Sequence, residues 1–298
     1  MSAISDATLQ EGLDTVAMYA TKFSRRECEH RTSSPIEVVD VTLESGAIVP
    51  MLLKDLWWES LAPEAQSAKP RVLSNPKREI EAYRFVSPID NTGMPSVYAS
   101  GDGWLLIERV AGLELYQVGE LEQWQRAAAW LGRFHRWGYQ RAPHETFLRH
   151  SGDWYRHWLT RALQFVPRTL TAHARLERLA FNYEIVIREL DLPKSILHGE
   201  FYASNVLVTP ERVCPVDWEM AAHGPGLTDV AALTAGEWSD FERDAMLLAY
   251  CEGSSACSNP GPSRSCSMRC SRRKVPTTTR LWNGSNSRSV LLRPIRWR

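Results

Sequence analysis

The sequence predicts an α+β fold in two lobes, with a small β-rich lobe over residues 1–110 and a mostly helical lobe over residues 111–251. Two observations lead to this prediction. Short β-branched and apolar runs separated by turn residues dominate the first part, and apolar residues at helical spacing dominate the second. A third observation sets residues 252–298 apart, because Ser, Arg, Pro, Gly and Asn replace any periodic pattern there.

The first lobe begins with a weak helical pattern over residues 9–23. Strands are predicted over 27–31, 36–43 and 48–56, with turns at 32–35 and 45–46 between them. Asn75 and Pro76 are a favoured N-cap and first helical residue, so a helix is expected over 77–86. Two further strands, over 96–100 and 104–110, complete this lobe.

The second lobe is predicted to contain amphipathic helices over residues 120–137, 151–166 and 171–190. Strand and loop segments follow over 195–208 and 213–216, and a last helix over 237–250. The sequence shows no internal repeat.

The net charge of zero conceals an asymmetry. Residues 252–298 carry ten Lys or Arg and one acid, which leaves 25 basic and 34 acidic residues in 1–251. An acidic body argues against nucleic acid as the main partner. The chain shows no signal-peptide pattern and no run of about 18 apolar residues, so we expect no membrane span and a cytoplasmic location.

The strongest chemical signal lies in two segments that each follow an apolar strand, ILHGEFYASNVLV and VCPVDWEMA. They place Glu200 before Asn205, and Asp217 further along the chain. Phosphoryl transfer needs a carboxylate that accepts or orients the proton of a hydroxyl group, and oxygen ligands for Mg²⁺. A base, an Asn and a later Asp in this order are the layout of a kinase catalytic loop and metal-binding turn.

The segment HGEFYASN resembles the catalytic loop of the aminoglycoside phosphotransferase family, and VDWE and GLTDVAAL resemble two further motifs of that family. The resemblance covers about residues 27–251 and implies a two-lobed protein-kinase-like fold that uses ATP and Mg²⁺. It implies that Glu200 is the catalytic carboxylate and that Asn205 and Asp217 are metal ligands. Glu219 would be an additional acid near the metal, and Asp229 would support the catalytic loop.

Glu200 departs from the family pattern, which has Asp at this position. The extra methylene moves the carboxylate by roughly 1.5 Å, and a misplacement of this size can cost ~10²-fold in rate. Either the loop compensates for the longer side chain, or the enzyme is slow, or the site binds its ligands without turning them over. We favour compensation by the loop.

Lys54 lies in the third predicted strand, where kinase-like folds hold the α- and β-phosphates with a lysine paired to a helix Glu. Glu79 and Glu81 are the two candidate partners. Glu79 lies on the apolar stripe of its helix, whereas Glu81 lies among Lys77, Arg78 and Arg84 on a face expected to be solvated. A buried Glu needs a partner, so Glu79 is preferred.

Other nucleotide contacts are expected from two places. The turn at residues 32–35 would cover the phosphates with Ser33 and Ser34, although an ordinary hairpin turn explains these residues equally well. The segment LLIERVAG would join the lobes and bind adenine through the carbonyl of Glu108 and the N–H of Val110.

Several conspicuous side chains are expected to be structural. His198 would hold the loop backbone, and His135 would be a core histidine with its hydrogen bonds satisfied. The tryptophans of the second lobe are mostly core, but one or two Trp or Tyr near residues 154–158 could face the substrate.

The tail over residues 252–298 contains Cys257, Cys266 and Cys270, close behind Cys251. Their spacing contains no CxxC pair, so neither a zinc site nor a basic nucleic-acid-binding tail is favoured. The abrupt change of composition indicates disorder, or a shifted reading frame or degraded gene end.

The sequence therefore predicts a small-molecule phosphotransferase whose acceptor is an aminoglycoside, another secondary metabolite or an amino-alcohol. A nucleotide-binding pseudoenzyme or inactive resistance-type protein is the alternative. A protein kinase is less favoured, because the Gly-rich loop, HRD and Asp-Phe-Gly motifs are missing. The oligomeric state stays open.

Overall fold

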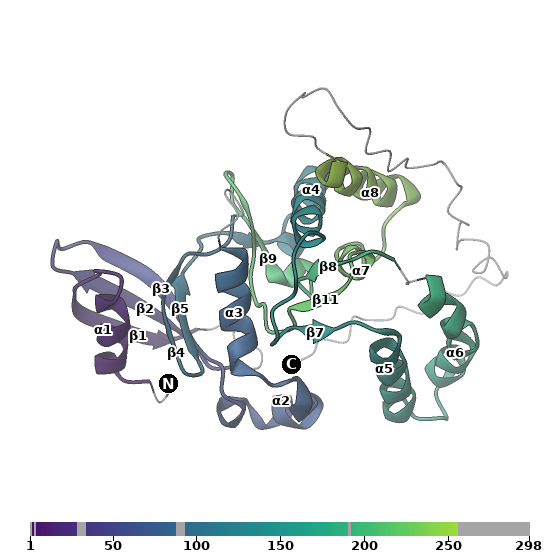
Figure 1. Ribbon diagram of the computed structural model, residues 1–298, viewed down its shortest axis with the longest axis horizontal. Helices are drawn as coiled ribbons and strands as arrows, with labels where there is room; N and C mark the ends of the chain where they lie inside the picture. Colours follow the sequence, from purple (N-terminus) through teal and green to yellow (C-terminus); the bar gives the residue numbers. More distant parts are fainter. Residues whose placement is uncertain (1, 3, 29–33, 88–92, 190–191, 256–298) are drawn as a thin grey trace. The chain divides into compact units, whose positions relative to one another are not determined.

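The computed structural model describes the chain except for residues 1, 3, 29–33, 88–92, 190–191 and 256–298 (Figure 1). Five strands form one antiparallel sheet in the order β1-β2-β3-β5-β4. They are β1 (Ala20–Glu27), β2 (Ile36–Leu43), β3 (Ile48–Asp55), β4 (Val97–Gly101) and β5 (Trp104–Glu108). The predicted second and third strands, and the two strands before residue 110, are confirmed to within two residues.

The alternation of side chains along β3 gives the sheet two different faces. Met51 and Leu53 belong to the cluster that packs under helix α1 (Asp6–Asp14). Leu52 packs into the other cluster, which includes the buried side of α3 (Pro76–Val86). Because successive strand residues point to opposite faces, Lys54 points to the same side as Leu52, toward α3.

The predicted helix over residues 77–86 is α3, and it begins as expected. The side chain of Asn75 accepts a hydrogen bond from the N–H of Lys77, and Pro76 is the first helical residue. This cap fixes where the helix starts and therefore which of its residues face the sheet.

The prediction for the first 31 residues was wrong in two respects. The helix lies over Asp6–Asp14, capped by Ser5, and not over 9–23. The first strand described is β1, over Ala20–Glu27, which begins well before the strand predicted over 27–31; residues 29–31 of that prediction lie outside the described residues. This strand is at the edge of the sheet and mostly exposed, so its sequence lacks the alternation by which a half-buried strand is recognised.

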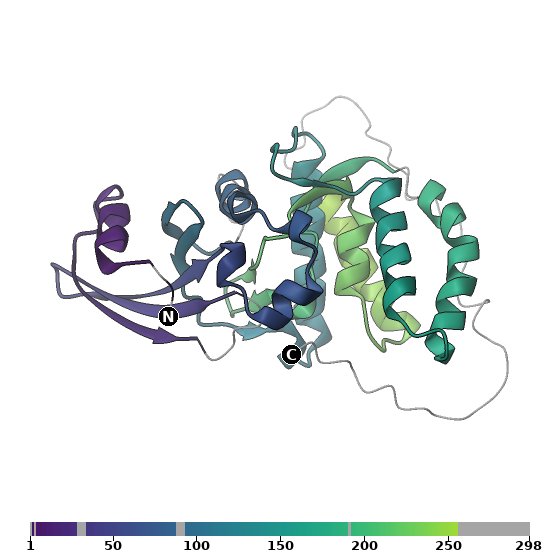
Figure 2. The same ribbon diagram turned by 90° about the horizontal axis from the view of Figure 1, so that it is seen from below.

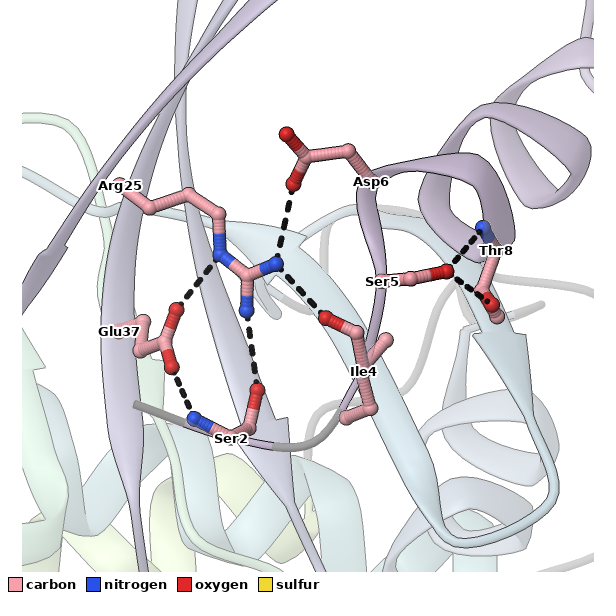
Figure 3. Close-up of polar contacts among 7 residues, drawn as sticks. All are labelled: Ser2, Ile4, Ser5, Asp6, Thr8, Arg25 and Glu37. Carbon is pink, nitrogen blue, oxygen red and sulfur yellow. Dashed lines mark hydrogen bonds and ion pairs between the residues drawn. The ribbon is translucent and has the colours of Figure 1, made fainter.

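Arg25 ties the segment before α1 to the sheet (Figure 3). Its guanidinium donates to the carbonyl of Ile4 at 2.7 Å, to Asp6 and the hydroxyl of Ser2 at 3.0 Å, and to Glu37 of β2 at 2.7 Å. Glu37 is buried, and Arg25 keeps its pKa below the usual value although burial acts in the opposite direction.

Helix α4 (Leu121–Gly138) packs closely against α8 (Asp240–Ser255) in the helical part of the chain (Figure 2). A Cβ on Gly132 would lie 2.2 Å from the carbonyl oxygen of Tyr250, and one on Gly253 would lie 2.2 Å from that of Ala129. The two glycines therefore permit the close approach of these helices.

The second part of the chain also contains two small sheets. One has the order β10-β9-β6 and the other β7-β11-β8. Their strands are β6 (Leu113–Glu114), β7 (Leu148–Arg149), β8 (Lys194–Leu197), β9 (Val206–Val208), β10 (Val213–Pro215) and β11 (Ala222–Pro225). Helices α5 (Gly152–Phe165) and α6 (Thr171–Glu189) lie side by side in both views (Figures 1 and 2).

Short elements were missed by the sequence analysis, namely α2 (Pro63–Ala68), β11 and α7 (Leu227–Leu233). Each has seven residues or fewer, so its helical or strand period repeats too few times to be recognised. Helix α8 also continues to Ser255, beyond the predicted end at residue 250, and takes the first four residues of the predicted tail. The rest of that tail lies outside the described residues. Of the helices described, none is both long and apolar enough to cross a membrane.

Candidate active site

Lys54 connects two carboxylates that belong to different parts of the chain. Its Nζ lies 2.5 Å from Oε1 of Glu79 on α3 and 2.8 Å from Oδ1 of Asp217, which follows β10. Lys54 and Glu79 are buried, and Glu81 instead pairs with Arg84 at 2.8 Å. The structure thus brings together three of the predicted residues.

The charges of this cluster depend on one another. Burial alone lowers the pKa of Lys54, but Asp217 and Glu79 outweigh burial and raise the pKa well above its usual value. Burial raises the pKa of Glu79 to about 7 although Lys54 opposes this effect, whereas Lys54 outweighs burial at Asp217 and lowers the pKa of that carboxyl. Lys54 therefore stays charged and favours the ionised form of Asp217 more than that of Glu79.

The loop after β8 is held by Asp229 of α7. Its carboxylate accepts the N–H of His198 at 2.7 Å and that of Gly199 at 2.9 Å, and contacts Nε2 of His135 at 3.2 Å. Asp229 is fully buried, and although burial raises its pKa, His135 and His198 bring it below the usual value. Asp229 thus supports the loop backbone at two consecutive residues.

His198 and Gly199 fix the shape of the loop. Nε2 of the buried His198 donates to the carbonyl of Val216 at 2.9 Å, so the loop is tied to the segment that leads to Asp217. Gly199 has φ 90°, and a Cβ there would lie 2.0 Å from the carbonyl oxygen of Met220. Only glycine fits this position without displacement of the backbone.

Glu200 follows directly, in a partly buried position. Burial, followed by the nearby carboxylates of Glu219 and Asp217, raises the pKa of Glu200 to about 8, and Lys69 opposes this increase. Glu200 therefore shares a small acidic region with the two predicted metal-binding acids. A carboxylate with a raised pKa is a strong proton acceptor when ionised.

Asn205 and Asp217 lie on either side of the small β9–β10 hairpin. Nδ2 of Asn205 donates to the carbonyl of Glu200 at 3.0 Å, which leaves its Oδ1 as the atom able to bind a cation. Asp217 has φ 66°, in the left-handed region that non-glycine residues rarely adopt. Strain of this kind is often found at functional sites.

Glu219 is the remaining predicted acid, and its carboxylate forms an ion pair with Lys69, the residue that follows α2. No sequence pattern singled out Lys69, because it follows a short helix in a segment without periodicity. Its role at the site became visible only with the contact to Glu219.

Arg78 was placed on a solvated face by the sequence analysis, and this was wrong. It is buried, and its guanidinium donates to three carbonyls, those of Thr146 at 2.9 Å, Leu73 at 2.8 Å and Glu219 at 3.0 Å. Arg78 precedes Ala82 by four positions and so lies on the inward side of α3. The sequence contains that spacing, but the prediction gave more weight to the charges of the neighbouring residues.

A cleft of about 640 Å³ lies beside the sheet. It is lined in part by Val38 of β2, Leu52 of β3, Val110 in the segment after β5, and Leu207 of β9. The predicted adenine-binding residue Val110 thus borders this cleft, whose lining also includes the charged residues Arg26, Glu27, Arg109 and Glu114. Glu108 ends β5, and its carboxylate pairs with Arg212 and accepts the N–H of Ser96 at 3.1 Å.

The predicted phosphate-covering turn is described only in part, because Ser33 lies outside the described residues. Ser34 borders a void of about 20 Å³ together with Lys69, Glu79 and Glu219. Ser34 is therefore close to the ion pairs described above.

No three His, Cys, Asp or Glu side chains are close enough to hold a metal ion within the part of the chain that the structure describes. Asn205 and Asp217 nevertheless fit Mg²⁺, because this ion typically takes one or two carboxylates and completes its shell with waters and substrate phosphates. Their oxygen donors are of the type that Mg²⁺ prefers.

The predicted structural side chains agree with the structure where it describes them. His135 is fully buried and contacts both Asp229 and the hydroxyl of Tyr250, at 3.0 Å. Trp124 and Trp130 are buried core residues. Trp154 is partly exposed and stacks on His150 with ring centres 4.6 Å apart.

Comparison with known proteins gives one family and several solved structures. The model of the phosphotransferase enzyme family matches residues 50–265. This range starts later and ends later than the resemblance found by motif. No curated protein sequence matches the chain significantly.

Three solved structures illustrate the similarity in fold. The macrolide 2'-phosphotransferase MphH from Brachybacterium faecium has a TM-score of 0.56 and 16% identity, over 86% of this chain and 84% of that chain. The choline kinase LicA from Streptococcus pneumoniae has a TM-score of 0.54 and 12% identity, over 82% and 79%. A complex of APH(2")-IIa with streptomycin and ATP has a TM-score of 0.52 and 16% identity, over 84% and 82%. The predicted two-lobed, kinase-like α+β fold is confirmed.

Proposed function

The chain belongs to the phosphotransferase enzyme family, and from this premise we propose that it transfers the γ-phosphate of ATP to a hydroxyl group of a small molecule, with Mg²⁺ as cofactor. The observation that carries the proposal is the position of Lys54, 2.5 Å from Glu79 and 2.8 Å from Asp217. A lysine paired with a helix Glu and a metal-binding Asp is the arrangement that orients nucleotide phosphates in kinase-like enzymes.

The roles proposed for the remaining residues follow from their places. Asn205 and Asp217 would bind Mg²⁺, which would neutralise charge on the phosphates, and Glu219 is a third oxygen donor nearby. Lys54 would bind the α- and β-phosphates, and Ser33 and Ser34 would cover them. The cleft bordered by Val110 would hold adenine, with the carbonyl of Glu108 and the N–H of Val110 as its polar contacts.

Glu200 would accept the proton of the acceptor hydroxyl. As the hydroxyl oxygen forms a bond to the γ-phosphorus, the bond from that phosphorus to the bridging oxygen of ADP breaks, and the hydroxyl proton passes to the Glu200 carboxylate. Burial, together with the nearby acids, raises the pKa of Glu200, so its ionised form accepts a proton readily, which supports this role.

The acceptor is proposed only as a class. The similar structures include a macrolide phosphotransferase, a choline kinase and a complex with streptomycin. Their shared feature is a small molecule with a free hydroxyl group, and similarity of fold does not choose among such acceptors. The predicted absence of a nucleic-acid partner, the cytoplasmic location and the boundaries at residues 110 and 251 stay predictions.

The test is ADP release by the purified chain with Mg-ATP and a panel of macrolides, aminoglycosides and amino-alcohols. We expect release that depends on one acceptor class and falls by about 10²-fold or more in Glu200→Gln, since the amide cannot accept the proton. Glu122→Gln removes an exposed carboxylate on α4 and serves as the matched control.

The outcomes separate the proposal from its alternative. Binding of Mg-ATP without release of ADP on any acceptor would favour a nucleotide-binding pseudoenzyme. Absence of nucleotide binding would contradict both. Equal activity of Glu200→Gln and Glu122→Gln would remove Glu200 from the mechanism while leaving the activity in place.

A further inference from the structure

Lys69 is a second lysine at the candidate site, and it comes from a different element than Lys54. It follows α2 in the segment that joins β3 to α3. This segment is folded onto itself, because the side-chain amide of Gln66 donates to the carbonyls of Trp58 and Leu61 at 3.1 Å each. Lys69 is thus presented to the site by an anchored turn.

The side chain of Lys69 is partly buried at the site. Its side chain is 18% exposed and pairs with Glu219, which is 27% exposed. Both residues border the small void shared with Ser34 and Glu79. The void therefore lies between the predicted phosphate-covering turn, the partner of Lys54 and the turn that carries Asp217.

The electrostatic reach of Lys69 extends to the other acids. Its charge contributes to the lowered pKa of Asp217 and opposes the increase in the pKa of Glu200. Lys69 is thus close enough to influence the proposed base and the proposed metal ligand as well as its direct partner.

Each of the two lysines pairs with a different acid of the turn after β10. Lys54 holds Asp217, and Lys69 holds Glu219. A dication bound by these acids would weaken both ion pairs, because like charges repel one another at short range. Lys54 would keep Glu79 as a partner, whereas no second ion pair of Lys69 is found among the described residues.

We propose that Lys69 is a further catalytic residue, which leaves Glu219 when the metal and nucleotide bind and then contacts the γ-phosphate as it is transferred. The inference rests on the proposed function. A lysine side chain has a flexible four-carbon stem, so its ammonium group can change partners while its backbone stays fixed. A cation placed at a transferring phosphoryl group stabilises the charge of the transition state.

The simpler possibility is that Lys69 only fastens the α2 segment to Glu219. The two roles differ in what they predict for metal binding. If Lys69 competes with the metal for Glu219, removal of Lys69 strengthens metal binding. A fastening residue, when removed, leaves metal binding unchanged or weaker.

The test compares Lys69→Met and Lys69→Arg with Lys77→Met, which removes an exposed lysine from α3. The first measurement is Mn²⁺ binding in the presence of ADP, followed by the electron paramagnetic resonance signal of free Mn²⁺. We expect Lys69→Met to bind Mn²⁺ at least about threefold more tightly than Lys77→Met, because a positive charge near the metal is gone. ADP lacks the γ-phosphate, so this measurement is independent of turnover.

The second measurement is the rate of ADP release with Mg-ATP. We expect kcat to fall by about 10²-fold in Lys69→Met, with a smaller loss in Lys69→Arg, which retains the charge. Tighter metal binding together with slower turnover is a combination that loss of structure does not produce. Thermal unfolding checks that each variant is folded, and Lys69→Gln replaces any variant that is not.

Each other outcome has a defined meaning. Unchanged or weaker Mn²⁺ binding in Lys69→Met, whatever its kcat, would overturn the inference and leave the fastening role. Tighter Mn²⁺ binding with unchanged kcat would overturn the contact with the γ-phosphate. If the unmodified chain binds no Mn²⁺ with ADP, the proposed function itself is overturned, and the inference with it.

Discussion

Nζ of Lys54 lies 2.8 Å from Oδ1 of Asp217, a contact between residues 163 positions apart in the sequence. Lys54 is fixed by the register of β3 in the five-stranded sheet, and Asp217 by the turn that follows β10. This ion pair is therefore sensitive to the packing of every element that positions either residue.

Replacement of Lys54 by Met is expected to disable the site. Glu79 and Asp217 would face one another without a cation, and the proposed phosphate contact would be lost. We expect kcat/KM for ADP release to fall by about 10²-fold or more. Lys22→Met, at an exposed position of β1, is the control and should retain the activity of the unmodified chain. Equal activity of the two variants would contradict a role for Lys54.

Replacement of Arg78 by Met is expected to lower the free energy of unfolding by about 3 kcal/mol. The change removes three hydrogen bonds and leaves the carbonyls of Leu73, Thr146 and Glu219 without this donor in or near the interior. Denaturant unfolding of Arg78→Met and Lys77→Met measures the difference. A difference below about 0.5 kcal/mol would be typical of a surface position and would contradict the structural role of Arg78.

Tyr83→Phe is expected to leave stability unchanged or to raise it by up to about 1 kcal/mol. Among the described residues, the hydroxyl of Tyr83 has no hydrogen-bond partner, and the side chain is only 1% exposed. Removing a buried, unpaired polar group costs little and relieves its desolvation. Thermal unfolding tests this expectation. A loss of more than about 1 kcal/mol would mean that the hydroxyl has a partner in solution, such as a water molecule.

His150 is expected to make the protein sensitive to acid. Burial lowers the pKa of His150 to about 4, although Asp229 raises it to a smaller extent. Neither ring nitrogen has a hydrogen-bond partner among the described residues. The folded state therefore binds a proton less readily than the unfolded state. Stability is complete above the unfolded pKa near 6.5 and is lost as the pH falls toward 4.

His150→Phe should reduce this sensitivity while keeping the stacking on Trp154. The contribution of His150 to the loss of unfolding free energy between pH 7 and pH 5 is about 2 kcal/mol. Denaturant unfolding at both pH values measures it, as the difference between the unmodified chain and His150→Phe. Equal losses in the two proteins would show that other groups cause the acid sensitivity.

Local patterns were sufficient for several elements of the fold. The alternation and turn residues over 36–55 located β2 and β3, and Asn75 with Pro76 located the start of α3. These signals depend on residues that are near neighbours in the chain, so the sequence contains them completely. The edge strand β1 and the short elements α2, β11 and α7 lack such signals, and their conformations depend on tertiary pairing.

The same distinction applies to the candidate site. The order and spacing of Glu200, Asn205 and Asp217 were readable because these residues lie in one loop and the hairpin that follows it, so their spacing is a local pattern of the chain. Helical spacing also distinguished Glu79 from Glu81, because it depends only on neighbours along one helix.

By itself, the sequence determined the type of fold, the family motifs and the side chains proposed for the chemistry. Only the tertiary structure decided that Lys69 pairs with Glu219, that Arg78 donates to the carbonyls of Thr146 and Glu219, and that Lys54 reaches Asp217. Each of these contacts joins segments that are remote in the chain. No local period records them, because they arise only when the sheet, α3 and the loops pack against one another.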